Sequence, residues 1–86
     1  MAQRHTLDAR NLLCPMPVIR VQGVMESLAP DEELVVLCTD PGAMSDVPAW
    51  CRVHGHEVLE VREDRDADEI RITIRAGPGD DDGRGD

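Results

Sequence analysis

Five consecutive apolar residues, LVVLC at positions 34–38, stand between acidic residues on both sides. A Val-rich run of this length suits a β-strand, and the lack of a polar position is typical of a strand covered on both faces. We therefore predict that residues 34–38 form the central strand of a sheet, joined to its neighbours by helical crossovers.

A helical period precedes this strand. Apolar residues recur at the spacing of one buried helix face, between the proline at position 15 and the proline at position 30. The residues of this apolar stripe are Val18, Ile19, Val21, Val24, Met25 and Leu28. The pattern predicts a helix that begins at Pro15 and ends before Pro30.

A second helix is predicted after the turn sequence TDPGA at 39–43. Ser45 or a residue near it can cap this helix, which runs to His54 and stops at Gly55. Pro48 then falls in the first turn, where a missing N–H costs little. Trp50 lies on the apolar face, and we expect it to be the large anchor of the core because it is the only aromatic residue.

Three further segments alternate in polarity and are predicted to be strands: residues 4–10, 57–63 and 69–76. In the second of these, Leu59 and Val61 are expected to point inward. The third alternates most strictly, and its apolar face consists of Ile70, Ile72 and Ile74.

The predicted order is therefore β-α-β-α-β-β. The simplest compact arrangement is an α/β (α+β) two-layer sandwich, in which two helices cover one face of a four-stranded mixed sheet. With 86 residues the chain has room for one core, so we predict a single domain over 1–76. The Gly- and Asp-rich segment 77–86 is expected to be a disordered acidic tail.

Charge and cysteine content restrict the function. A net charge of −9 disfavours binding to a phosphate backbone, so we expect no direct nucleic-acid partner. No apolar stretch approaches the length of a membrane span. The three cysteines, Cys14, Cys38 and Cys51, include no Cys-x-x-Cys pair and cannot all pair with one another. We expect a monomeric cytoplasmic protein with reduced thiols.

The sequence Cys14-Pro15-Met16-Pro17 lies where the first strand passes into the first helix. With Cys14 as the helix cap, Pro15 is the first and Pro17 the third helical residue, where prolines are tolerated and preorganise the turn. The Met16 N–H is then free and points toward the cap. The positive end of the helix dipole favours a thiolate, so Cys14 is either a nucleophile or simply a small cap residue.

The stretches LDARNLLCPMPVI, TDPGA, DVPAWCRVHGHEV and IRITIR resemble the TusA/SirA-like family of sulfur-carrier proteins, over residues 7–76. Members of that family are small two-layer α/β sandwiches with this order of elements. The resemblance implies a sulfurtransferase that acts as a persulfide carrier, without a metal or an organic cofactor. Cys14 would receive sulfur from a cysteine desulfurase or a rhodanese-type donor and pass it to an acceptor protein.

The resemblance also assigns supporting positions. Pro15 and Pro17 would shape the motif, and Asp40 matches a recurrent family position. Its carboxylate either orients the loop or discourages indiscriminate ionisation of the thiol, or it simply caps a helix or turn. Family members often carry charged residues at the positions of Leu13 and Met16, so this chain departs from the pattern beside its cysteine. The pathway served, whether tRNA thiolation, molybdenum-cofactor sulfur supply or sulfur oxidation, stays open.

Two other functions are compatible with the residues. One is a non-catalytic regulatory module of the same fold, and the other is a thiol redox protein, which the lack of a resolving cysteine disfavours. Cys38 and Cys51 are expected to be core residues. A metal site at Cys51, His54 and His56 is not expected, because no fourth ligand stands at a usual spacing.

Overall fold

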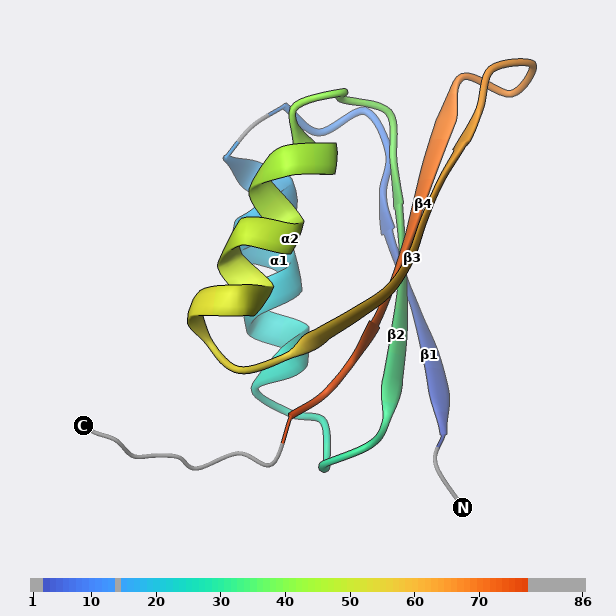
Figure 1. Cartoon of the computed structure of the whole chain (residues 1–86). Coiled ribbons are helices and arrows are strands. Elements are labelled where there is room, and N and C mark those ends of the chain that lie inside the picture. Colours follow the sequence, from blue (N-terminus) through green and yellow to red (C-terminus); the bar gives the residue numbers. More distant parts are fainter. Residues whose placement is uncertain (1–2, 14, 78–86) are drawn as a thin grey trace.

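The computed structural model describes residues 3–13 and 15–77, which form six elements in the order β-α-β-α-β-β (Figure 1). The elements are β1 (Arg4–Ala9), α1 (Met16–Met25), β2 (Glu33–Cys38), α2 (Ala43–Val53), β3 (Glu57–Asp64) and β4 (Glu69–Arg75). The order confirms the one predicted from the sequence.

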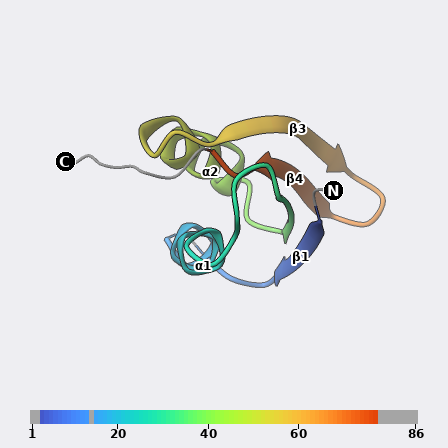
Figure 2. The same ribbon diagram turned by 90° about the horizontal axis from the view of Figure 1, so that it is seen from below.

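The four strands form one mixed sheet in the spatial order β1-β2-β4-β3. β1 and β2 are parallel, while β4 is antiparallel to both β2 and β3. The two helices lie side by side on one face of the sheet, and the other face carries no helix (Figures 1 and 2). The predicted two-layer sandwich is confirmed, with β2 in the interior of the sheet.

The core lies between the helices and the sheet, and it contains no aromatic side chain among its fully buried members. Ile72 and Ile74 are fully buried and Ile70 is nearly so, which confirms the predicted inward face of β4. Burial of each such side chain contributes about 1.5–3 kcal/mol to stability. The other buried apolar residues are Ala9, Val21, Met25, Leu34, Val35, Val36, Cys38, Ala43, Val47, Cys51 and Ala76.

Within the described residues, the second face of β2 is covered without a helix, in keeping with the predicted two-layer arrangement. Val35 and Leu37 point to the face of the sheet opposite the helices, yet Val35 is only 9% exposed. It lines a hollow of about 380 Å³ together with Leu59, Thr73 and several charged side chains. The apolar stems of long charged residues therefore replace a second helical layer over this part of the strand.

Of the two inward positions predicted in β3, Leu59 is wrong, whereas Val61 shares the face of its register partner Ile72 without being buried. Leu59 and Val61 are 39% and 41% exposed, whereas Val58 packs against the core. The pairing with β4 shifts between Val58 and Glu60, which is the signature of a β-bulge. The bulge leaves both Leu59 and Glu60 on the open face beside Thr73, and a strict two-residue period cannot reveal such an insertion.

The helix boundaries differ modestly from the prediction. α1 ends at Met25 and continues as turns, in which the N–H groups of Ser27 and Leu28 donate to the carbonyls of Val24 and Met25. α2 begins at Ala43, so Pro48 lies inside the helix and not in its first turn.

Candidate functional site

Cys14, the centre of the predicted site, lies outside the described residues. Its neighbours in sequence, Leu13 and Pro15, are described, as are Met16, Pro17 and Asp40. The site is therefore built here from the segments that lead to the cysteine and away from it.

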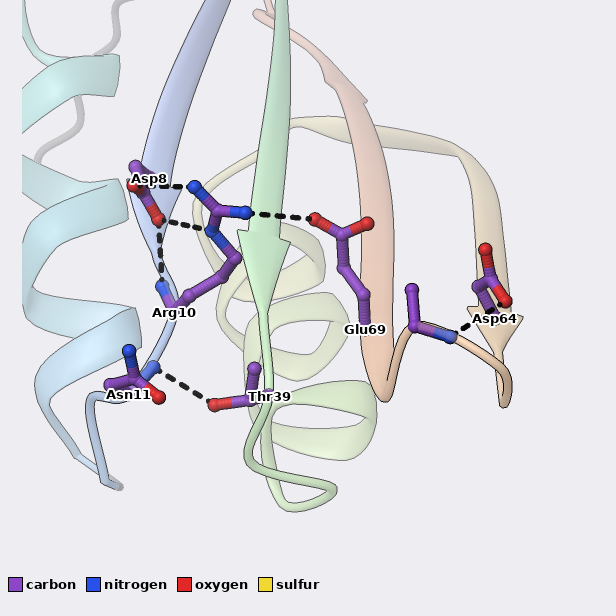
Figure 3. Close-up of polar contacts among 7 residues, drawn as sticks. Asp8, Arg10, Asn11, Thr39, Asp64 and Glu69 are labelled. Atoms are coloured by element: carbon purple, nitrogen blue, oxygen red, sulfur yellow. Dashed lines mark hydrogen bonds and ion pairs between the residues drawn. The ribbon is translucent and has the colours of Figure 1, made fainter.

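The loops that follow β1 and β2 lie at the same edge of the sheet. Ala9 and Cys38, the last residues of the two parallel strands, are paired in register. One residue beyond Cys38, the Thr39 hydroxyl accepts a hydrogen bond of 2.9 Å from the Asn11 N–H (Figure 3). Asn11 has a φ of 67°, in the left-handed region that Asn tolerates better than most residues. This contact fixes the loop that leads to the cysteine against the end of β2.

Arg10 holds the same loop from the open face of the sheet. Its guanidinium donates to both oxygens of Asp8, at 2.9 and 3.0 Å, and lies 3.8 Å from a carboxylate oxygen of Glu69 on β4 (Figure 3). The hydrogen bonds from Arg10 lower the pKa of the Asp8 carboxyl to about 2. The side chain of Arg10 thus connects β1 to β4 across the end of β2.

The start of α1 differs from the prediction by one residue. Pro15 is the N-cap, with a non-helical ψ of 14°, and Pro17 is the second helical residue. The Met16 N–H is not free, because it donates to the Leu13 carbonyl at 2.8 Å. This bond precedes the first helical hydrogen bond, which the Ile19 N–H donates to the Pro15 carbonyl at 3.1 Å.

The hydrogen bond at Met16 changes the expected electrostatics at the helix start. Neither proline has an N–H, and the Met16 N–H is already bonded, so none of these three positions offers a free amide donor to an anion. The favourable electrostatic contribution that remains is the dipole of α1, which is equivalent to roughly half a positive charge at the start of a helix.

Asp40 lies in the second loop of the same sheet edge. Its carboxylate accepts a hydrogen bond of 3.1 Å from the Gly42 N–H, and its carbonyl accepts one of 3.0 Å from the Ala43 N–H. Both contacts shape the turn that starts α2. Contacts of this kind are those of a turn cap, one of the roles predicted for Asp40.

Cys38 and Cys51 are fully buried members of the core, as predicted. Burial raises the pKa of each thiol to about 11, and the nearby Asp40 carboxylate contributes at Cys38. Both are therefore protonated near neutral pH and shielded from reagents, so neither has the properties of a nucleophile.

Trp50 is not the central core residue that the sequence predicted. It is half-buried at the margin of the core and stacks on His54 and His56, with ring centroids 4.5 and 5.4 Å apart. Burial and the proximity of His54 lower the pKa of His56. Within residues 3–13 and 15–77, no three His, Cys, Asp or Glu side chains are grouped to hold a metal ion.

Ile19, assigned to the buried stripe of α1 by its spacing, is 51% exposed. Met16, one helical turn before it, is 38% exposed, and Leu13 is 74% exposed. Sequence reasoning missed this surface because the i, i+3 spacing of Met16 and Ile19 also fits a buried face. The available signal was that Ile19 only widens the stripe formed by Val18, Val21, Met25 and Leu28, and so lies at its margin.

The fold and this edge define a small α/β sandwich with a Cys-Pro-x-Pro sequence between its first strand and first helix, the arrangement that the resemblance to sulfur carriers implied. The sequence model of the family described as "Sulfurtransferase TusA" matches residues 5–76. The chain belongs to the TusA sulfurtransferase family, which confirms the resemblance.

Individual relatives agree with this assignment. The chain is 39% identical over 77 residues to the "Putative sulfur carrier protein YrkI" of Bacillus subtilis (strain 168), covering 90% of this chain and all of that protein. The crystal structure of a SirA-like protein from Desulfitobacterium hafniense superimposes with a TM-score of 0.76 at 28% identity, covering 85% of this chain and 97% of the other. In the part of the chain that the structure describes, neither helix is long and apolar enough to cross a membrane.

Proposed function

We propose that this protein carries sulfur as a persulfide on Cys14, receiving it from a cysteine desulfurase or a rhodanese-like protein and passing it to an acceptor protein. The observation that carries the proposal is the family match, which spans the Cys-Pro-Met-Pro motif. The other two thiols support it, since both are buried and have a pKa of about 11.

The chemistry is a transfer of one sulfur atom between thiols. The Cys14 thiolate attacks the terminal sulfur of the donor persulfide, a new S–S bond forms, and the donor S–S bond breaks to release the donor thiolate. In the second step an acceptor thiolate attacks the same terminal sulfur and releases the Cys14 thiolate. Electrons balance in each step, so the relay needs no oxidant, reductant or cofactor.

The loop contacts support this role by restricting the motion of the backbone on both sides of the motif. The hydrogen bonds at Asn11 and Met16 hold the two sides of the cysteine position, and the dipole of α1 favours the thiolate. We place the activity in the cytoplasm, where thiols stay reduced and a persulfide can be passed on.

Intact-protein mass spectrometry tests the proposal. Incubation with a cysteine desulfurase and cysteine should add one sulfur atom, which a reductant removes and which Cys14→Ser abolishes. The same adduct in the Cys14→Ser variant, or none with desulfurase and rhodanese donors, would contradict the proposal and favour the regulatory module.

A further inference from the structure

Three exposed apolar side chains surround the motif, and we call them the apolar rim: Leu13, Met16 and Ile19. They are 74%, 38% and 51% exposed, and none belongs to the core or packs against it. Met16 and Ile19 are neighbours on α1, and the hydrogen bond between Met16 and Leu13 holds the third residue next to them. The rim therefore joins exposed apolar side chains from the end of the loop and the first turn of α1.

The rim is also uncharged, on a chain with a net charge of −9. Residues 11–19 contain no ionisable side chain apart from the cysteine. Arg10, at one end of this stretch, is neutralised by Asp8 and Glu69. Arg20, at the other end, is exposed and makes no ion pair within the described residues.

We infer that the sulfur donor docks on the apolar rim through an apolar surface of its own, with a carboxylate at the edge facing Arg20. This inference rests on the proposed function. Direct transfer requires the two sulfur atoms to come into bonding contact, and Leu13 and Pro15 are covalently bonded to Cys14. Any protein that reaches the sulfur therefore meets Leu13, and Met16 and Ile19 extend this exposed apolar surface along α1.

The chemistry of the rim identifies the donor surface. A charged donor side chain placed against Leu13, Met16 and Ile19 would lose its hydration and gain no counter-charge. An apolar surface is instead stabilised by the area that both partners remove from water. A donor that recognises charged residues on either side of the cysteine, as often found in the family, should load this chain poorly.

The test uses loading of the full-length protein, followed by intact-protein mass spectrometry. The donors are the cysteine desulfurase that loads the wild type, and inorganic polysulfide, which needs no docking. Ile19→Glu and Ile19→Arg change an exposed side chain without touching the motif. Val53→Glu is the matched control, because Val53 is 80% exposed at the end of α2 that lies away from the motif loop (Figure 1).

Both Ile19 variants should load from the desulfurase at least about tenfold more slowly, which is the loss expected for a residue at the centre of an interface. Their loading by polysulfide should stay within about twofold of the wild type. The control variants Val53→Glu and Ile19→Leu should load within about twofold of the wild type from both donors, because single changes at exposed positions are otherwise nearly neutral.

Wild-type rates in the Ile19→Glu variant would overturn the inference. So would opposite effects of Glu and Arg, which indicate a charged donor surface, or an equal loss with polysulfide. A wild-type protein that gains no sulfur from either source contradicts the proposed function itself.

Discussion

The backbone N–H of Gly77 donates a hydrogen bond of 2.9 Å to Nδ1 of His56, which connects the end of β4 to the residue before β3. The imidazole can accept this bond only while Nδ1 is unprotonated. Burial and the nearby His54 lower the pKa of His56, so the folded state favours the neutral ring that the contact requires.

This contact predicts a loss of stability in mild acid. The unfolded chain protonates His56 at its ordinary pKa of about 6.5, before the folded chain does, so the free energy of unfolding falls as pH drops through that value. The loss should be at most about 1 kcal/mol, because the ring is partly exposed. Denaturant unfolding at pH 7.5 and 5.5, followed by Trp50 fluorescence, measures it. His56→Gln should flatten the difference, and an equal pH dependence in both proteins would place the titration elsewhere.

A pair of glycine substitutions tests the same connection without a change of pH. A Cβ added at Gly77 would lie 1.9 Å from the Gly55 carbonyl oxygen, so Gly77→Ala must displace backbone, and should cost roughly 1–3 kcal/mol. Gly23, in α1, has nothing within 4 Å of such a Cβ, so Gly23→Ala should stabilise the protein by about 0.5–1 kcal/mol. Thermal unfolding of the two variants should shift in opposite directions. A neutral Gly77→Ala would show that the connection contributes little.

The Thr39 hydroxyl should determine how tightly the motif loop is held. Thr39→Val removes the acceptor of the Asn11 N–H, and is expected to lower the free energy of unfolding by about 1 kcal/mol. Amide exchange at Asn11 should accelerate, while Thr39→Ser, which keeps the hydroxyl, should behave like the wild type. Unchanged Asn11 exchange in Thr39→Val would mean that the hydrogen bond does not hold this loop.

The three cysteines should differ sharply in reactivity. Cys38 and Cys51 are buried with a pKa of about 11, so native protein at pH 8 should take up iodoacetamide only at Cys14. Peptide mapping after labelling assigns the sites. Cys14→Ser should stay unlabelled until it is denatured, and then label at both remaining cysteines. Native labelling at Cys38 or Cys51 would contradict their burial.

Much of the fold could be predicted because local pattern and tertiary packing agree. Strict alternation identified the buried isoleucines of β4, and the apolar run at 34–38 identified the interior strand. The errors arose where one inserted residue changes which face a side chain occupies, or where one hydrogen bond lies at the start of a helix. The bulge at Leu59 and Glu60 breaks the two-residue period of β3, and α1 starts one residue later than predicted, after the hydrogen bond from Met16 to Leu13.

The site was less predictable than the fold. The motif and its place between strand and helix follow from local sequence, but the contacts that support it do not. Arg10 meets Glu69, and Asn11 meets Thr39, only because the sheet order brings these segments together. The exposure of Ile19 depended on which side of α1 faces the sheet, and a continuous apolar stretch leaves that choice open.

The position of Gly77 has a practical consequence. Arg75, two residues earlier, pairs with Glu33 at the first position of β2, whereas the motif loop follows the last position of β1. Gly77 therefore lies at the pole opposite the Cys-Pro-Met-Pro loop. Anchoring the protein to a sensor chip or fusing it to a carrier through that pole should leave the motif loop open to solution.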